Sequence, residues 1–357
     1  MFRSNETTYA LFKICNAMLI VVLAGCEELG IGPKKESPET APPLVESVAP
    51  VTPPVQQAPV QMPPTVAVTP ESTVAEFIAM RSNVITDDAI LKVVDLVPAN
   101  ALVTELNLRG APVTRNGLTA LARLPQLRKL DMSGSAFQPA VLAGISAVTQ
   151  LEELLLENAV LDNAGLAAVA PLVNLKKLNI SRTAVTDDGF MHLTRLSKLE
   201  SINCQGLSIT GAGFEAFTGK YANAPLKEIN ANNTTFGVHG FKHLTGMNQL
   251  ESLSAGHSQV TDEALKGIRG CTGMKILQLP GNNVTDQGFK TLNGLKAFET
   301  LDVGGNALFS DFTLNKLDSC TGLKLLKIQG TACTVNGVQK LKRSLPECAI
   351  EFNNTTY

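Results

Sequence analysis

The sequence predicts an α/β solenoid in which a short strand and a short helix recur in every repeat. Three observations lead to this fold class. Leucine-like residues return at a regular interval of about 24 residues, which is typical of a repeat protein, through most of the 357-residue chain. Each copy begins with apolar residues at alternate positions, which is the period of a strand with one buried face. Later in the copy, apolar residues spaced three apart follow a threonine, as expected for a short capped helix.

The repeat register becomes clear when each copy starts at its first apolar residue. Most steps have the same length, and the two longer steps follow Leu199 and Phe298, where the copies carry small insertions. A looser copy precedes the array at 75–102, with Ile78 and Met80 at strand positions, and a strand-like piece follows at 349–352. The copies start at Val103, Leu127, Leu151, Leu175, Leu199, Leu226, Leu250, Met274, Phe298 and Leu323.

A strand is predicted at the beginning of each copy, because the fourth and sixth positions are both apolar. Such alternation places these two side chains on the same, buried face of a strand. Five copies show the pattern most clearly: Leu130 and Met132, Leu154 and Leu156, Leu178 and Ile180, Leu301 and Val303, and Leu326 and Ile328.

A short helix is predicted in the second half of each copy. The sequences at 186–189, 261–264 and 285–288 begin with Thr-Asp. The hydroxyl is a good helix N-cap, and the acid suits the positive end of the helix dipole. Glycine recurs in this region, and we interpret it as a site of close packing between helix and strand rather than a phosphate-binding loop. These glycines are Gly117, Gly165, Gly189, Gly213, Gly240, Gly288 and Gly337.

One strand, one capped helix and one return loop in each copy resemble the leucine-rich-repeat superfamily, specifically its ribonuclease-inhibitor-like and cysteine-containing types. The resemblance covers 103–352, with an amino-terminal cap from about residue 74. It implies a right-handed solenoid with a parallel concave sheet, short convex helices and a concave face that binds proteins. The chain departs from many members at the ninth position, where an asparagine ladder is expected but small and hydroxylated residues predominate.

The amino terminus has the features of an export signal at 1–25. Arg3 and Lys13 precede an apolar run at 14–24, which suits a signal peptide and is short for a membrane-spanning helix. The run ends in Leu23-Ala24-Gly25-Cys26, which resembles the bacterial lipobox. The resemblance implies a lipid on Cys26 and an exported protein anchored to a bacterial membrane, on its periplasmic or cell-surface side. An uncleaved anchor and an ordinary cleavage site remain alternatives, and either of them also exports the chain.

A proline-rich linker is predicted at 26–73. Eleven prolines lie between residues 27 and 73, without a regular apolar period. A segment of this composition cannot bury enough apolar surface to offset its chain entropy. We therefore expect a disordered tether between the anchor and the solenoid, whose cap occupies 74–102 and whose repeats and final strand occupy 103–357.

A partner-binding patch is predicted on the concave face, where the third, fifth and seventh residues of each copy point outward. These positions are polar and rich in amides. A solvated sheet surface without a partner has the same composition and remains the alternative. Central repeats carry the predicted patch because a curved array lets one ligand contact several of them. The predicted residues are Glu153, Glu157, Asn179, Arg182, Asn203, Gln205, Asn230 and Asn232.

No catalytic, metal or cofactor site is predicted. The array contains no nucleophile elbow, phosphate-binding loop, dinucleotide fingerprint or zinc-protease motif. His239 and His243 are four residues apart, but no third ligand lies nearby in sequence. Cysteines 204, 271, 320, 333 and 348 mostly occupy positions that apolar residues fill in other copies, so we interpret them as small core residues.

These features favour a membrane-tethered interaction module that binds a protein through its concave face. The net charge of −2 gives no reason to expect a nucleic-acid partner. The alternative is a structural or cell-envelope protein that recognises polysaccharide or acts as a spacer. The absence of tryptophan and the presence of only three tyrosines argue against stacking platforms for sugars.

Overall fold

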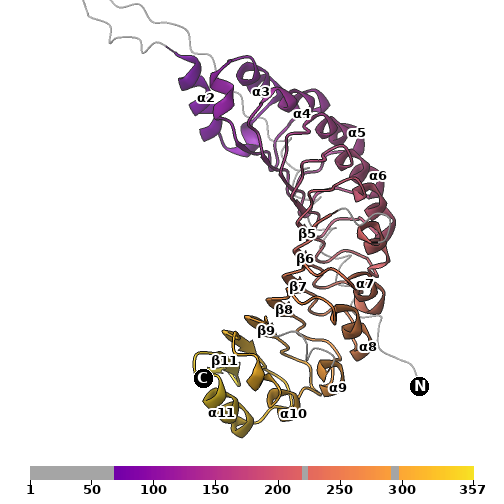
Figure 1. The fold of residues 1–357 in the computed structure, drawn as a ribbon. Helices are drawn as coiled ribbons and strands as arrows, with labels where there is room; N and C mark the ends of the chain where they lie inside the picture. Colours follow the sequence, from indigo (N-terminus) through magenta and orange to yellow (C-terminus); the bar gives the residue numbers. More distant parts are fainter. Residues whose placement is uncertain (1–67, 219–223, 291–296) are drawn as a thin grey trace, which may run out of the picture. The chain divides into compact units, whose positions relative to one another are not determined.

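The computed structural model describes residues 68–218, 224–290 and 297–357. They belong to one compact unit, Val66–Tyr357. Their strands form a single 12-stranded sheet in sequence order, from β1 to β12. Figure 1 shows the strands along the inner side of this solenoid and the helices along the outer side, which confirms the predicted fold class. The predicted signal peptide (1–25), Cys26 and most of the predicted linker (26–73) lie outside the described residues.

The strands begin at the third position of each copy, as the apolar alternation predicts. All neighbours from β1 to β11 pair in parallel, with equivalent residues of successive repeats opposite each other. The strands are β1 Glu105–Asn107, β2 Lys129–Asp131, β3 Glu153–Leu155, β4 Lys177–Asn179, β5 Ser201–Asn203, β6 Glu228–Asn230, β7 Ser252–Ser254, β8 Ile276–Gln278, β9 Thr300–Asp302, β10 Leu325–Lys327, β11 Ala349–Phe352 and β12 Thr355–Thr356.

Short helices return the chain from one strand to the next. Among the described residues, none has the length and apolar character needed to cross a membrane. The α-helices are α2 Pro70–Ala79, α3 Asp87–Val94, α4 Arg115–Ala120, α5 Pro139–Leu142, α6 Asn163–Leu166, α7 Gly237–His243, α8 Asp262–Leu265, α9 Asp286–Phe289, α10 Asp311–Leu314 and α11 Val335–Ser344. The 3-10 helices are η1 Ser82–Val84, η2 Ala99–Leu102, η3 Leu121–Arg123, η4 Ala143–Ala147, η5 Ala167–Val169, η6 Asp187–Leu193, η7 Ala212–Phe217, η9 Lys266–Ile268 and η11 Leu317–Ser319.

The core runs between the sheet and the helices as one continuous cluster. The alternating strand residues all lie in it, and Leu178 and Ile180 are representative, with 2% and 0% of their surfaces exposed. In the middle of the array a chain of phenylalanine rings crosses successive repeats. Phe214 lies at its centre, with its ring centroid 5.2 Å from that of Phe190 and 4.9 Å from that of Phe236.

The amino-terminal cap is helical where the sequence suggests a degenerate strand. Helix α2 begins at Pro70, behind Thr69, whose side chain accepts a hydrogen bond from the N–H of Ser72. Residues 70–73, which the sequence assigns to the linker, are therefore helical. The prediction that Ile78 and Met80 occupy buried strand positions is wrong, because 51% and 41% of their surfaces are exposed. A proline at the first helical position and a capping hydroxyl start a helix here, and the helix turns different residues inward.

The second half of the cap follows the repeat pattern. Thr86 caps helix α3 by accepting from the N–H of Ala89, and Ile85 and Ile90 are buried. The cap therefore closes the end of the core with helices and contributes no strand to the sheet.

The acid in the first turn of several helices has a role that the sequence pattern does not reveal. Asp262 accepts hydrogen bonds from Thr285 of the next repeat, from its backbone N–H at 2.7 Å and from its hydroxyl at 2.6 Å. Asp311 receives the same two bonds from Thr334. Equivalent contacts join Asp87 to Thr114, Asp187 to Thr210 and Asp286 to Ser310. These bonds form a ladder, called here the Asp–Thr ladder, that links the starts of five helices to the following repeat.

The repeated glycine makes room for this ladder. A Cβ atom built on Gly117 would lie 2.1 Å from Asp87 Oδ1, and one on Gly337 would lie 2.2 Å from Asp311 Oδ1. Real atoms do not approach so closely, so a side chain here would displace the carboxylate. Close packing explains the glycine, as expected, but at these two sites the neighbour is the preceding repeat's acid rather than a strand.

Asparagine at the ninth position stabilises the turn behind the strands in the later repeats. Asn282 is buried, its Oδ1 accepts from the N–H groups of Ser258 and Val260, and its amide group donates to the carbonyls of Ala255 and Leu279. Asn306 makes equivalent contacts one repeat further on. In earlier repeats hydroxyls take part of this role, because the hydroxyl of Thr183 donates to the carbonyl of Ile180.

A hairpin closes the carboxyl-terminal end. The predicted last strand is β11, and the chain then turns through Asn353 and Asn354, whose φ angles are +48° and +58°. These left-handed angles suit asparagine and match a tight hairpin turn. Strand β12 pairs antiparallel with β11 and shields its edge.

The five cysteines are buried, as expected for small core residues. Burial raises the pKa of the Cys271 thiol to about 11, and burial also raises that of Cys333 to about 11. A thiol with such a pKa is protonated near neutral pH and is therefore a poor nucleophile.

Candidate functional site

The predicted residues come together on the outward surface of the sheet, called here the strand face. The register pairs Asn179 with Asn203, and Asn203 with Asn230, on the adjacent strands β4, β5 and β6. Glu153 lies on the neighbouring strand β3. Because the strands pair in parallel about 4.8 Å apart, polar residues that are one repeat apart in sequence lie side by side in one row.

The asparagines in this row also shape the backbone. Asn179 Oδ1 accepts from the N–H of Ser181 at 3.0 Å and from the Ser181 hydroxyl at 2.7 Å. Asn203 and Asn230 accept from the N–H two residues further on, at 3.1 Å each. The amide oxygens are thus engaged within the protein. An alanine at one of these positions would lose that acceptor, so an alanine replacement would test folding and binding together.

Glu157, Arg182, Gln205 and Asn232 lie just beyond the ends of these strands. Arg182 Nη1 is 3.7 Å from Glu157 Oε1, and the Asn230 amide group donates to Gln205 Oε1 at 3.4 Å. Asn232 Oδ1 accepts from the N–H of Gly256. Glu153 is 3.5 Å from the ammonium of Lys129 on β2. The structure therefore brings all eight predicted residues into one polar patch with internal contacts.

Arg182 stands out in this patch because of its backbone. Its φ angle is +56°, in the left-handed region that disfavours residues with a Cβ atom. The equivalent position in other repeats is mostly glycine or asparagine, as at Gly134, Asn158 and Gly206. His257 is the other exception, with a φ angle of +52°. The fold requires this backbone conformation in each repeat but does not require an arginine, which is a reason to examine Arg182 for function.

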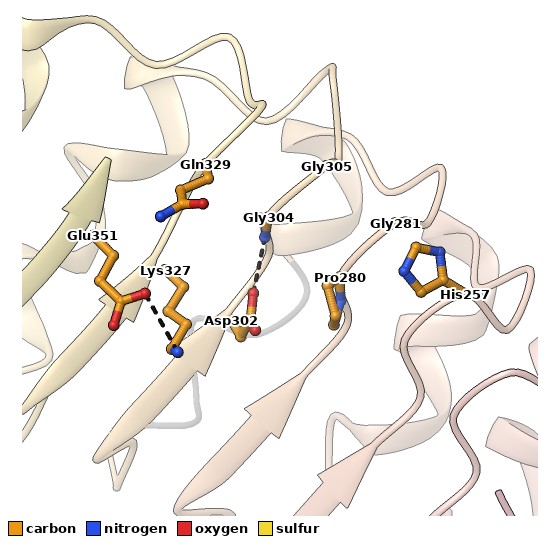
Figure 2. A pocket seen from close by; sticks show the side chains of 9 residues that line it. All are labelled: His257, Pro280, Gly281, Asp302, Gly304, Gly305, Lys327, Gln329 and Glu351. Atoms are coloured by element: carbon orange, nitrogen blue, oxygen red, sulfur yellow. Dashed lines mark hydrogen bonds and ion pairs between the residues drawn. The ribbon is translucent and has the colours of Figure 1, made fainter. Parts of the chain in front are cut away.

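A hollow in the strand face lies outside the predicted patch, toward the carboxyl end. Its volume is about 400 Å³, and Figure 2 shows the side chains around it. The hollow, called here the glycine hollow, is lined by His257, Pro280, Gly281, Asp302, Gly304, Gly305, Lys327, Gln329 and Glu351.

Small residues at the seventh position create this hollow. Pro280 and Gly304 stand where earlier repeats carry Glu157 and Gln205. The imidazole of His257 lies across Gly281, since a Cβ atom there would be 2.1 Å from His257 Cε1. The sequence indicated this hollow by small residues at the seventh repeat position. A search for outward polar residues does not find it, because these residues have no polar side chains.

Charged groups of both signs surround the glycine hollow. The ammonium of Lys327 is 3.3 Å from Glu351 Oε2, and Asp302 Oδ1 accepts from the N–H of Gly304 at 3.0 Å (Figure 2). Burial raises the pKa of Asp302. The hydrogen bond from the Gly304 N–H and the charge of Lys327 lower this pKa, but burial has the larger effect. Two carboxylates and one ammonium leave the hollow with an excess of negative charge.

His257 also borders a second depression of about 570 Å³, lined by Gly206, Leu207, Ser208, Asn233, Thr234, Thr235 and His257. The imidazole therefore stands between two depressions. A metal site at the other histidines finds no support, because the described residues contain no group of three or more His, Cys, Asp or Glu suited to a metal ion.

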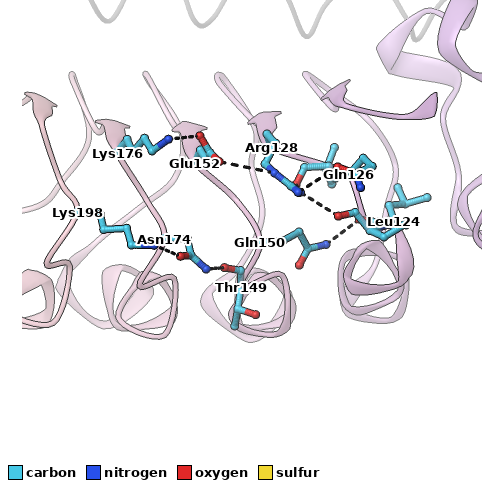
Figure 3. A network of polar contacts seen from close by, with 11 residues as sticks. Leu124, Gln126, Arg128, Thr149, Gln150, Glu152, Asn174, Lys176 and Lys198 are labelled. Atoms are coloured by element: carbon cyan, nitrogen blue, oxygen red, sulfur yellow. Dashed lines mark hydrogen bonds and ion pairs between the residues drawn. The ribbon is translucent and has the colours of Figure 1, made fainter. Parts of the chain in front are cut away.

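A row of alternating charges runs along the edge of the strand face where the strands begin. Glu152 lies between Arg128 and Lys176, at 3.7 Å and 2.6 Å (Figure 3). Three later pairs continue the row at 3.0, 2.7 and 2.6 Å: Glu200 with Lys227, Glu251 with Lys275, and Glu299 with Lys324. These pairs are partly exposed, so each contributes little to stability, but together they keep this edge nearly neutral.

The comparisons with known proteins reveal the fold. No protein-family model matches the sequence, and the search of curated proteins also gave no match. Among solved structures, the chain is similar to an internalin (inlF) from Listeria monocytogenes, with a TM-score of 0.53 and 17% sequence identity. The match covers 81% of this chain and 96% of the internalin chain. At this identity the similarity concerns architecture, and it supports the leucine-rich-repeat fold that the repeat period predicts.

Proposed function

We propose that this protein is an exported, lipid-anchored interaction module that binds a protein partner through its strand face. The observation that carries the proposal is the parallel register, which places polar side chains of four adjacent central repeats, β3 to β6, in one patch. Solenoids of this kind offer extended surfaces to their partners. The arginine held in a left-handed conformation at residue 182 supports the same surface.

The proposal is tested by photo-crosslinking in cells that make the protein. A photoreactive amino acid at Gln205, in the patch, is expected to capture a protein partner. The same group at Lys316, which is exposed on the helix side, is expected to capture none. Mass spectrometry identifies the captured species. Capture from residue 316 alone would show that the partner binds the helix side and would contradict the proposal. Recovery of carbohydrate at residue 205 would favour the polysaccharide alternative.

Arg182→Gly separates binding from folding in the same experiment. Glycine occupies this position in other repeats and adopts the left-handed conformation without strain. We expect the free energy of unfolding to stay the same or rise by about 1 kcal/mol. Capture at residue 205 should fall, because the cation of the patch is lost. Unchanged capture, measured beside a urea unfolding curve, would argue against a role for Arg182 in binding.

The lipid anchor is the second part of the proposal, and it rests on the lipobox-like sequence at 23–26. Cys26→Ala should abolish incorporation of a clickable palmitate analogue and release the protein from the membrane fraction. Cys348→Ala is the matched control, because Cys348 is a buried core residue far from any cleavage signal. Continued labelling of the Cys26 variant would contradict the assignment.

A further inference from the structure

We propose that the glycine hollow receives a basic side chain, arginine or lysine, from the protein partner. The inference rests on the proposed function and specifies the chemistry of one contact. A volume of about 400 Å³ is at the small end of ligand pockets, which span roughly 300 to 1,000 Å³. Such a hollow suits one long side chain better than a folded segment. Gly304 and Gly305 line it with backbone alone, so no side chain of these two residues blocks the ligand.

The charge distribution selects a cation. Lys327 is engaged by Glu351, and its ammonium makes no ion pair with Asp302 within 4.0 Å in the described part of the chain. The hydrogen bond known for Asp302 uses Oδ1 and the N–H of Gly304. Asp302 lines the hollow, and its carboxylate has no ion-pair partner within 4.0 Å among the described residues. A carboxylate that is partly withdrawn from water gains most when a cation comes close.

The same arrangement disfavours an anion or an uncharged sugar. An anion would meet Asp302 and Glu351 and would compete with Glu351 for Lys327. A sugar ring would find no phenylalanine, tyrosine or tryptophan among the lining residues to stack on. Arginine is the better of the two basic side chains here, since its planar guanidinium can bind Asp302 and still present donors to the Gln329 amide oxygen.

Asp302 has a substitution that removes its charge and keeps its structural role. The equivalent strand position is asparagine at Asn179, Asn203 and Asn230, where the amide oxygen accepts the same backbone N–H bond. Asp302→Asn should therefore fold as the wild type does. Asp131→Asn is the matched control, because Asp131 Oδ1 accepts from the N–H of Ser133 at the same position of a distant repeat.

The test titrates N-acetyl-arginine amide into the full chain and follows the amide NMR signals of Gly304 and Gly305. We expect saturable shifts with a Kd on the order of millimolar, as for a single partly buried ion pair. N-acetyl-citrulline amide, the uncharged analogue, should cause none. Asp302→Asn should weaken the binding of the arginine amide by about tenfold or more, and Asp131→Asn should leave it unchanged.

Three results would overturn the inference: no shifts at tens of millimolar, equal shifts from the citrulline amide, or the same Kd in Asp302→Asn. Each is distinct from a failure of the proposed function. If the hollow does not bind the cation while residue 205 still captures a protein partner, binding through the strand face stands and only the role of the hollow is wrong. If both fail, the strand face is a solvated surface.

Discussion

Phe214→Ala is expected to lower the free energy of unfolding by about 3 to 5 kcal/mol. The side chain is fully buried, and its ring packs against those of Phe190, Phe217 and Phe236. Phe190 and Phe236 belong to the repeats before and after, and Phe217 to the same repeat, so the cavity would weaken contacts between repeats as well as within one. In a solenoid those contacts carry the cooperativity, because each repeat touches only its neighbours. We expect a lower midpoint in urea unfolding followed by circular dichroism.

Phe312→Ala is the control for this measurement. About half of the Phe312 surface is exposed, and the ammonium of Lys290 lies 5.0 Å from its ring centroid. Removing an exposed ring with one cation–π contact should cost no more than about 1 kcal/mol. Similar losses from the two variants would mean that the phenylalanine chain does not couple the central repeats.

Gly337→Ala is expected to destabilise the protein by about 2 to 3 kcal/mol, although alanine normally stabilises a helix relative to glycine. The added methyl group would lie 2.2 Å from Asp311 Oδ1. The carboxylate would have to move, and it would lose its bonds to the N–H and hydroxyl of Thr334. The higher helix propensity of alanine would offset only about 1 kcal/mol of this loss. Thermal or urea unfolding shows directly whether the substitution lowers or raises the free energy of unfolding.

A double-mutant cycle identifies the cause. If the clash with Asp311 is responsible, Gly337→Ala should cost little more in an Asp311→Ala background, where the carboxylate is absent. Gly322→Ala serves as the control glycine, since the nearest atom to its added Cβ would be the Phe298 carbonyl oxygen at an ordinary 3.5 Å. Additive losses in the cycle would show that Gly337 matters for a reason other than the Asp–Thr ladder.

The strands, their register and the core positions could be predicted from the sequence because each depends on a pattern within one repeat. Leu178 and Ile180 are buried for a reason that a single copy already shows. The Asp–Thr ladder could not be predicted in this way. Its donors and acceptors lie in different copies of the repeat and meet only when neighbouring repeats are stacked. The acid therefore looked like a simple response to the helix dipole.

The sequence predicted the central patch but not the glycine hollow. Polar outward residues predicted the central patch, and the structure places all eight of them together. The sequence could not show that Asn179 and Asn203 use their oxygens to hold the backbone. The glycine hollow depends on positions without side chains, Gly304 and Gly305, and a search for chemical groups passes over such positions. The amino-terminal cap was misjudged at Ile78, because spacing alone does not distinguish a helix from a degenerate strand.

The row of alternating charges along the strand edge constrains how the array can change in length. From Arg128 to Lys324, each repeat carries the opposite sign to its neighbours at this position. Deleting or duplicating one internal repeat would place two like charges side by side. Changing the array by two repeats would preserve the alternation. A shortened version that lacks an even number of consecutive internal repeats therefore keeps opposite charges adjacent along this edge, whereas one that lacks an odd number does not.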